Sequence, residues 1–402
     1  MQYLQSAVDQ YCPLHPLLSV RLPVRQEPYP SVATDVFLAG LLPEDPIRTS
    51  LANSARVAPG DIYGMLRAYG RECAGAIQVL DSSDSQLSGQ DVLWRTPDEL
   101  GNDLAELPTA PLGTSIDRRV RVSLGGLQGK LLVVKDGDRI GVPIDGRPST
   151  HILKPARLKE DGSELWPGIA QLETFALKLL NHTQLIANGV EAAEAEVLDI
   201  QGRKAILVRR YDREVDPDTG VVRRIHQEDF CQALGITAKY QQVAHGSPNL
   251  VQVAEALRAH ASKPLPEIIK LLKMLACNMA IGNCDMHARN ISLLLQRNGV
   301  SLAPAYDVVP TAVWPDLDRE LSLRIGGEAF LDDLTADHLL AEAMSWGLRS
   351  AAASRQVRIV LDALASAIPL VTQQAQDEGW WHPLFNEVTK GRHRRIEMLT
   401  PA

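Results

Sequence analysis

The stretch Gly282-Asn-Cys-Asp-Met-His-Ala-Arg-Asn290 lies between two patterns that together decide the fold. Before it, Pro266 suits the first turn of a helix, and apolar residues recur with helical spacing over 267–282. After it, 291–295 alternates as a strand does, Asn298-Gly299 is a strong hairpin signal, and 300–303 returns as the partner strand. We therefore expect a polar loop that leaves a buried helix and enters a hairpin.

The polar residues of this loop suit phosphoryl transfer to a hydroxyl. That reaction needs a carboxylate to orient the hydroxyl and accept its proton, and oxygen ligands for magnesium. Asp285 is followed five residues later by Asn290, and Asp307 comes after the hairpin. This spacing predicts Asp285 as the catalytic base and Asn290 and Asp307 as magnesium ligands. The spacing alone is weak, because Asp285 could instead end the helix, Asn290 could stabilise a turn, and Asp307 could cap a helix near Pro310.

His287 lies inside the same loop and has two interpretations. It is a catalytic candidate because histidine transfers protons near neutral pH. It could equally be a core histidine that holds the loop by hydrogen bonds.

The upstream half of the chain has the matching order of elements. Residues 122–134 predict a strand, a glycine-rich bend and a second, apolar strand. The bend contains Gly125, Gly126 and Gly129, without the GKS or GKT that would make a Walker A motif. Lys154 ends a short apolar strand, and Glu173 follows on a helix expected over 169–187. A glycine-rich turn over the phosphates, a strand lysine on the phosphates and a helical glutamate paired with that lysine occur in this order in protein kinases. The plainer alternatives are a hairpin bend, a solvated strand end and an exposed helical glutamate.

Composition limits the class of protein. The formal charge of −8 argues against whole-surface binding to nucleic acid, and no apolar run of about 18 residues is present. The five cysteines have scattered spacing, so we expect reduced core thiols in a cytoplasmic protein rather than a zinc site. We expect three parts: 1–112, 113–225 with the glycine-rich loop, and a helical 226–402 with the catalytic loop.

Six motifs in this order resemble the HipA-like serine/threonine kinase toxins of type II toxin–antitoxin modules. The resemblance covers nearly the whole chain, with Arg71-Glu-Cys-Ala-Gly-Ala76 and 37–43 similar to the family's N-terminal part. It implies an α+β, two-lobed protein-kinase-like fold with a mixed α/β N-lobe and an all-α C-lobe, and it implies ATP and Mg²⁺ as cofactors. The six motifs are Ser123-Leu-Gly-Gly-Leu-Gln-Gly-Lys130, Ser149-Thr-His-Ile-Leu-Lys154, Arg210-Tyr-Asp-Arg213, His226-Gln-Glu-Asp-Phe230, Asp285-Met-His-Ala-Arg-Asn290 and Pro304-Ala-Tyr-Asp307.

The resemblance also implies further site residues. Ser123 matches a serine that such kinases phosphorylate in their own glycine-rich loop, which ejects the loop and switches the kinase off. It assigns Arg209, Tyr211, Gln227 and Tyr306 to ATP binding, although Gln227 could instead cap a helix.

The chain departs from the family pattern at three places. Arg209 stands where the family usually has an acidic residue, and Arg289 stands where lysine is usual. The family normally has more strand-forming sequence before Leu17, so we expect a small N-terminal subdomain that is shortened at its start.

The implied partners are a HipB-like helix-turn-helix antitoxin and a protein substrate such as an aminoacyl-tRNA synthetase. DNA contact is expected mainly through the antitoxin, since the basic run 390–395 is more typical of a solvated helix face. Two rival functions remain: a small-molecule phosphotransferase, and a pseudokinase that acts as a corepressor on an antitoxin–operator complex.

Overall fold

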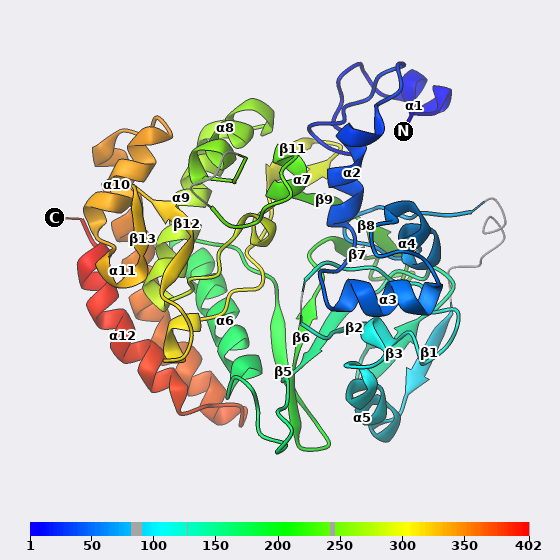
Figure 1. Cartoon of the computed structure of the whole chain (residues 1–402). Coiled ribbons are helices and arrows are strands. Elements are labelled where there is room, and N and C mark those ends of the chain that lie inside the picture. The colour runs from blue at the N-terminus through cyan, green and yellow to red at the C-terminus, as the bar shows by residue number, and fades with distance from the viewer. Residues whose placement is uncertain (82–90, 127, 242–245, 402) are drawn as a thin grey trace. The chain divides into compact units, whose positions relative to one another are not determined.

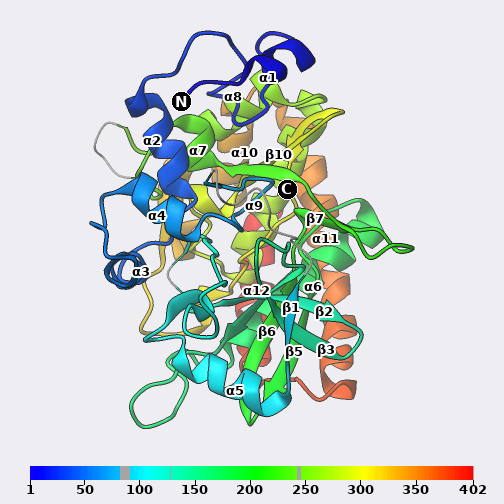
Figure 2. The same ribbon diagram turned by 90° about the vertical axis from the view of Figure 1, so that its right-hand side faces the viewer.

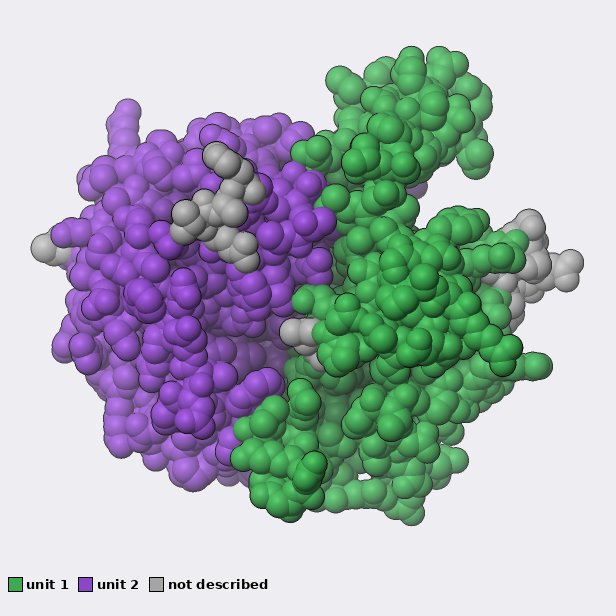
Figure 3. Space-filling view, in the orientation of Figure 1, with its two compact units in different colours: residues 1–165, 196–228 green, residues 166–195, 229–402 purple. Residues whose placement is uncertain are grey.

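The chain folds into two units, each with its own core (Figure 3). A computed structural model describes residues 1–81, 91–126, 128–241 and 246–401. Unit 1 is 1–165 with 196–228, and unit 2 is 166–195 with 229–402. This division differs from the three expected parts, because residues 1–112 share a unit with the strands that follow them. The helix expected over 169–187 belongs to the unit that contains the C-terminal helices.

Unit 1 is built on a six-stranded sheet with the order β1-β3-β2-β4-β6-β5. Strands β2 and β4 lie in the middle, and Leu131, Leu132, Val133 and Leu153 are almost completely buried. The run Leu131–Val134 is buried at every position, which is typical of a strand covered on both faces. The strands are β1 (Val92–Arg95), β2 (Leu131–Asp136), β3 (Arg139–Pro143), β4 (His151–Pro155), β5 (Ala195–Ile200) and β6 (Arg203–Arg209).

Short helices, together with loop residues such as Leu22 and Val120, supply the rest of the core of unit 1, and Figures 1 and 2 show these helices. Helix α5 packs against β1, and it begins with Pro97 and a capping box between Thr96 and Glu99. Phe37, Met65 and Leu104 join the apolar cluster that includes strands β2 and β3. The helices are α1 (Gln5–Gln10), α2 (Ser31–Gly40), α3 (Ile47–Ala55), α4 (Ile62–Tyr69), α5 (Pro97–Glu106) and the 3-10 turn η2 (Pro111–Gly113).

The segment that enters the glycine-rich turn is not the strand that its sequence predicts. Among the described residues it forms only an isolated parallel bridge between Val122 and Glu72. The strand predicted after the turn does form, as β2. Two more short strands, β7 (Arg213–Val215) and β8 (Val222–Arg224), pair with each other, and β9 (His226–Asp229) carries the chain into unit 2.

Unit 2 is mainly helical. Helix α6 (Ile169–Ala187) has the predicted bounds and ends at Asn188 in the left-handed conformation, as expected. It packs against α11, and Phe175 stacks on Phe385 of α12 with ring centroids 4.2 Å apart. None of the helices within the described residues is long and apolar enough to cross a membrane. The other helices are α7 (Phe230–Leu234), α8 (Leu250–His260), α9 (Pro264–Ile281), α10 (Ala336–Ser345), α11 (Ser350–Asp377) and α12 (Leu384–Leu399).

The C-terminal half is not all-α, so that part of the expected fold is wrong. The hairpin predicted at Asn298-Gly299 forms between β10 (Ser292–Gln296) and β11 (Gly299–Leu302). A second hairpin joins β12 (Glu320–Ile325) and β13 (Glu328–Phe330) through Gly326 and Gly327, both with positive φ. Turn chemistry of this kind favours strands even within a helical unit. Three 3-10 turns complete the unit: η3 (Ala288–Asn290), η4 (Thr311–Val313) and η5 (Leu331–Asp333).

The cysteines follow the expectation with one exception. Cys73, Cys231, Cys277 and Cys284 are buried free thiols. Burial raises the pKa of Cys73 and of Cys277 to about 12, so both stay protonated at neutral pH. Cys12 is exposed, so the expectation of a core position is wrong for this residue.

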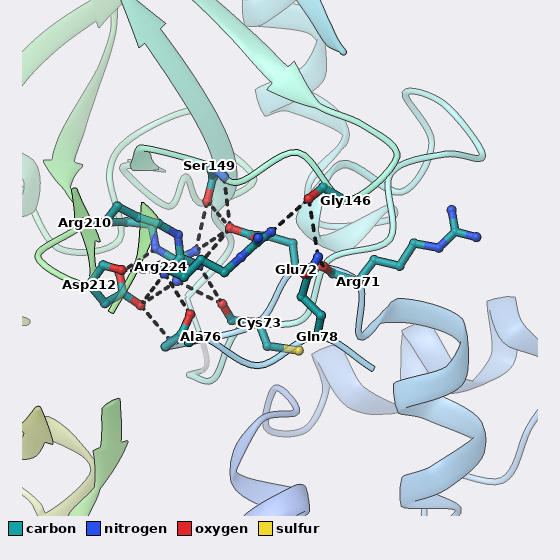
Figure 4. Close-up of polar contacts among 12 residues, drawn as sticks. Arg71, Glu72, Cys73, Ala76, Gln78, Gly146, Ser149, Arg210, Asp212 and Arg224 are labelled. Atoms are coloured by element: carbon teal, nitrogen blue, oxygen red, sulfur yellow. Dashed lines mark hydrogen bonds and ion pairs between the residues drawn. The ribbon is translucent and has the colours of Figure 1, made fainter. Parts of the chain in front are cut away.

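A buried network of charges lies inside unit 1 (Figure 4). Glu72 contacts Arg210 at 3.2 Å and Arg213 at 2.9 Å, and Asp212 contacts the same two arginines at 2.7 and 3.1 Å. Arg224 reaches Glu72 from the rim at 2.7 Å. Burial alone would raise the pKa of Glu72, but Arg213, Arg210 and Arg224 outweigh it and hold that pKa below its ordinary value. Both carboxylates therefore stay charged, which balances two buried guanidiniums.

Neutralising one of these carboxylates should be costly. Glu72→Gln and Asp212→Asn each leave a buried guanidinium uncompensated, so each should lower the free energy of unfolding by about 3–5 kcal/mol in urea denaturation followed by circular dichroism. Asp136→Asn is the matched control, because its partner Arg139 and Asp136 itself are more than 60% exposed, at 63% and 62%. A loss no larger in Glu72→Gln than in the control would contradict the importance of the network.

His226 should make the stability of unit 1 depend on pH. Its Nε2–H donates to Leu18 O at 2.7 Å and its Nδ1 accepts from Ala76 N–H at 3.3 Å, an arrangement that only the neutral ring allows. Burial lowers the pKa of His226. The unfolded chain, with a histidine pKa of about 6.5, therefore binds the proton more readily than the folded chain. Stability should fall as the pH drops from about 7 toward 5, and His226→Gln should flatten that fall, whereas substitution of the exposed His393 should leave it unchanged.

Candidate functional site

The loop 282–290 is held by a chain of buried amides at the end of α9. Gly282 ends the helix with φ +87, and a Cβ there would lie 2.9 Å from the Cβ of Ala312. Asn283 donates from Nδ2 to Asn278 Oδ1 at 2.7 Å, and its own Oδ1 accepts from Asp285 N–H at 3.0 Å. The buried helix therefore sets the position of the first half of the loop.

Asp285 is one of two half-exposed residues in a loop that is otherwise buried. Its carbonyl accepts from His287 N–H at 2.9 Å and from Asn290 Nδ2 at 2.9 Å. Its carboxylate oxygen Oδ1 accepts from the Ser322 hydroxyl at 3.3 Å. Ser322 also donates its N–H to Cys284 O at 3.0 Å, so strand β12 braces the loop through one residue. Asp285 and Asn290 are thus brought together, as the spacing predicts.

The plainer interpretation of Asp285 as a helix cap does not hold. The C-cap of α9 is Gly282, whose N–H donates to Asn278 O and Met279 O. The turn-stabilising interpretation of Asn290 holds in part, since its amide nitrogen closes the loop on Asp285.

Asp307 follows the β10–β11 hairpin in a conformation that few residues adopt. Its φ is 55, in the left-handed region, where aspartate is tolerated better than most residues. The residue before it, Tyr306, donates its hydroxyl to Arg289 O at 2.6 Å. The Tyr306 side chain therefore ties the segment before Asp307 to the end of the loop. Asp307 does not cap the turn near Pro310, because Pro310 itself precedes η4 and no side chain caps that turn.

His287 is buried, and its ring meets Tyr240 edge to face with centroids 5.4 Å apart. The next residue, Ala288, donates its N–H to Lys239 O at 3.1 Å. Lys239 and Tyr240 thus contact the loop beside the histidine, and the choice between a holding role and proton transfer for His287 stays open.

In the glycine-rich turn of unit 1, a lysine at the end of the turn bonds to the backbone at its start. Lys130 donates from Nζ to Gly125 O at 2.6 Å. Gly126 has φ +102, and a Cβ there would lie 2.7 Å from that same Nζ. Gly126 is therefore needed for its backbone conformation, whereas the flexible end of Lys130 could move to make room for a Cβ. Gly129 leaves ordinary contact distance to Leu107, and Leu127 lies outside the described residues.

Ser123 lies just before this turn and is completely buried. Its hydroxyl donates to Leu41 O at 2.6 Å and its N–H donates to Glu72 O at 2.8 Å. The hydroxyl is therefore covered while the segment keeps this conformation.

Lys154 and Glu173 are both buried, so neither plainer interpretation holds for them. Lys154 lies in the central strand β4 and is 7% exposed, which excludes a solvated strand end. Glu173 lies on α6 and is 1% exposed, which excludes a surface glutamate. The two belong to different units, so their ion pair stays a prediction.

Two of the residues that the family resemblance assigns to ATP binding, Tyr211 and Gln227, contact each other within unit 1. Tyr211 donates its hydroxyl to Gln227 Oε1, and Gln227 donates from Nε2 to Asp212 Oδ2 at 3.2 Å. Gln227 does not cap a helix, because Asp229 is the N-cap of α7. Arg209 is exposed at the end of β6, paired with His151 in the register of the sheet.

Asn290 and Asp307 suit a magnesium ion by their chemistry. Both offer side-chain oxygens, which Mg²⁺ prefers, and it commonly completes its shell with water and phosphate oxygens. Over the described ranges, no group of three or more His, Cys, Asp and Glu side chains could hold a metal. A site of one amide, one carboxylate and a nucleotide does not require such a group.

Sequence reasoning missed Ser322, Asn278 and the role of Glu72. Ser322 contacts Asp285 from 37 residues away. Glu72 contacts Ser149 from 77 residues away. Only Asn278 carried a local signal, since an asparagine on the buried face of a helix needs a polar partner.

Comparison with known sequences agrees with the motifs. Residues 1–80 match the HipA N-terminal domain, and 122–369 match the HipA-like C-terminal domain. A Sinorhizobium fredii protein, Y4mE, whose name assigns it provisionally to the kinases, is 34% identical over 90% of this chain and 84% of its own length. The serine/threonine-protein kinase toxin HipA of Shewanella oneidensis is 26% identical over 85% of this chain and 79% of its own.

Comparison of structures gives the same fold. HipA in a complex of Shewanella oneidensis MR-1 HipA, HipB and operator DNA superposes with a TM-score of 0.78 and 23% identity. The match covers 95% of this chain and 87% of that one. With both domains matched in order and a relative that is 34% identical over most of the chain, this protein belongs to the HipA-like family.

Proposed function

We propose that this chain is an ATP- and Mg²⁺-dependent serine/threonine protein kinase. The observation that supports it most directly is the placement of Asp285. Asp285 is half-buried and lies on a buried loop that is braced by Asn283, Asn290 and Ser322. A carboxylate held in this way costs little reorganisation when it receives a hydroxyl.

In this proposal Asp285 accepts a hydrogen bond from the hydroxyl of the substrate serine or threonine. That bond orients the hydroxyl oxygen of the substrate toward the γ-phosphorus. As the new O–P bond forms, the bond between the γ-phosphorus and the β–γ bridging oxygen breaks, and ADP leaves with that electron pair. The hydroxyl proton passes to Asp285. Ser322 keeps the carboxylate oriented, and His287 supports the loop against Tyr240.

The remaining predicted residues bind the nucleotide and its metal. Asn290 and Asp307 hold magnesium, which when bound neutralises charge on the phosphates. Lys154 contacts the phosphates and pairs with Glu173. The other proposed ATP-binding residues are Gly125, Gly126, Gly129, Arg209, Tyr211, Gln227 and Tyr306.

We further propose that the kinase is the growth-arresting toxin of a toxin–antitoxin pair. Membership of the HipA-like family and the fold shared with a HipA bound to HipB and operator DNA support a HipB-like antitoxin as its partner. DNA contact then arises mainly through the antitoxin. The proposed substrate is a translation protein such as an aminoacyl-tRNA synthetase.

Asp285→Asn should abolish most of the turnover without loss of the fold. Removing the base should lower kcat by about 10²- to 10⁴-fold, while the KM for ATP stays close to that of the wild type. The measurement is transfer of radiolabelled γ-phosphate to proteins of a cell lysate, with magnesium present.

The control for this prediction is Asp316→Asn, the same change at an exposed position of unit 2. Wild-type turnover by Asp285→Asn would overturn the assignment of the base. Label that enters small molecules but no protein would favour a small-molecule phosphotransferase, and the absence of nucleotide binding would favour a pseudokinase.

Ser123 is the proposed site of autophosphorylation, and its burial gives that modification a physical consequence. A phosphate adds a charge of about −1.5 to −2, and the oxygen that faces Ser123 Oγ is the carbonyl of Leu41. The phosphorylated residue does not fit the buried position. The segment must therefore leave it, which removes the glycine-rich turn from the nucleotide.

Incubation with ATP and magnesium should place phosphate on Ser123, detected by mass spectrometry of phosphopeptides. Ser123→Ala should lack that phosphopeptide and keep its activity over time, while the wild type declines as the modification accumulates. Ser115→Ala tests the nearby exposed serine. Phosphate on Ser115 with none on Ser123 would contradict the assignment.

A further inference from the structure

Glu72 is buried although it lies outside every helix and strand of the described chain. It is 1% exposed, and Figure 4 shows its carboxylate surrounded by donors from distant segments. Its backbone is also engaged: its N–H donates to Arg121 O at 3.2 Å, and its carbonyl accepts from Ser123 N–H at 2.8 Å. The peptide groups of Glu72 thus fix the segment that enters the glycine-rich turn.

The carboxylate of Glu72 fixes a second segment. Oε1 accepts from Ser149 N–H at 3.0 Å and from the Ser149 hydroxyl at 2.9 Å. Ser149 comes just before β4, the strand that carries Lys154. A shift of Glu72 would therefore shift the start of that strand.

The same carboxylate fixes a third segment, on both sides of Tyr211. Arg210 donates to Oε1 at 3.2 Å and to Ser149 Oγ at 2.9 Å. Arg213 donates to Oε1 at 2.9 Å. Both arginines also contact Asp212, and Asp212 accepts from Gln227. The network therefore extends to the Tyr211–Gln227 pair.

A purely stabilising role does not account for so many directional contacts. Buried ion pairs add little stability compared with apolar residues of the same size, but they define one arrangement, because each hydrogen bond requires a set direction. The three segments that converge on Glu72 are the ones to which nucleotide binding is assigned in unit 1. The rest of unit 1 is held by an apolar cluster that does not need Glu72.

We propose that Glu72 is a positioning residue for the nucleotide: one carboxylate and its own peptide groups hold the glycine-rich turn, the lysine strand and the Tyr211 segment in mutual register. This inference rests on the proposed kinase function, because only that function makes ATP the ligand of the three segments. Glu72 itself does not touch the nucleotide in this proposal.

The test compares Glu72→Gln and Ser149→Ala with the wild-type chain in steady-state kinetics. Ser149→Ala is the milder change, since it removes one hydroxyl and leaves the charges in place. Glu72→Gln should raise the KM for ATP about tenfold and Ser149→Ala about threefold, with kcat at saturating ATP little changed. Because Glu72→Gln weakens the contact between Ser149 Oγ and Glu72 Oε1 that Ser149→Ala removes, the double variant should raise KM by less than the product of the two single effects.

The matched control is Leu104→Ala, which removes a buried side chain of α5 in the same unit. It lowers the melting temperature without touching the network, so its KM for ATP should equal that of the wild type. All variants are measured at a temperature at which circular dichroism shows them folded. A KM unchanged in Glu72→Gln and Ser149→Ala, with only a lower melting temperature as in Leu104→Ala, would overturn the proposal.

Hydrogen exchange without nucleotide separates this inference from the kinase proposal. In Glu72→Gln, the exchange of amides in 121–126, 149–154 and 210–213 should speed up together, and by a larger factor than that of amides in α5, which report the general loss of stability. Faster exchange in one segment alone, or in none, would overturn the positioning role. If the wild type bound no Mg-ATP, the kinase proposal would fail, and the exchange pattern would still decide whether Glu72 couples the three segments.

Discussion

The loop of unit 2 depends on a single buried amide. Asn283 joins the end of α9, through Asn278, to the backbone N–H of Asp285. Helix α9 is buried along most of its length, so it cannot shift without disturbing the core of unit 2. The packed core thus holds the backbone of Asp285, whose residue is half-buried. Two further contacts support the loop. Ser322 of strand β12 donates its hydroxyl to Asp285 Oδ1, and the Thr311 hydroxyl, in the turn after Asp307, accepts from Cys284 N–H at 2.9 Å.

The two units hold their polar loops in different ways. In unit 2, neutral amides and hydroxyls brace the loop against a helical core. In unit 1, ionised side chains do so: two carboxylates and two guanidiniums are buried together, with a third guanidinium at the rim. Charges that are fully paired keep their pKa values far from neutrality, so this network stays ionised across the physiological pH range. His226, which packs nearby, differs from this network, because burial lowers its pKa and favours the neutral ring.

Elements with strong local patterns could be predicted from the sequence. Helix α6, the end of α9 at Gly282 and the Asn298-Gly299 hairpin form where the pattern places them, because periodicity and turn chemistry act over a few residues. The strand expected at Val122 does not form, because its partner is the single residue Glu72 rather than a neighbouring strand. The all-α C-terminal half that the family resemblance implies is also wrong, because the turn residues at Asn298-Gly299 and Gly326-Gly327 form two hairpins there.

The candidate site divides in the same way. Asp285 and Asn290 could be found by their spacing, whereas Tyr211 was implied only by the resemblance to a family. Ser322 and Glu72 could not be found in either way, because each acts across a long stretch of chain and a serine or glutamate carries no sign of its partner. Their roles follow only from three-dimensional contacts, which no local pattern records.

The covered hydroxyl of Ser123 sets an order of events. A phosphate can reach this oxygen only after its bond to the Leu41 carbonyl has broken and the segment has opened. Under the proposed autophosphorylation, the modified segment no longer fits its buried position. The rate at which the unmodified segment opens then limits how fast the proposed kinase is switched off. Burial of this hydroxyl thus delays the proposed inactivation.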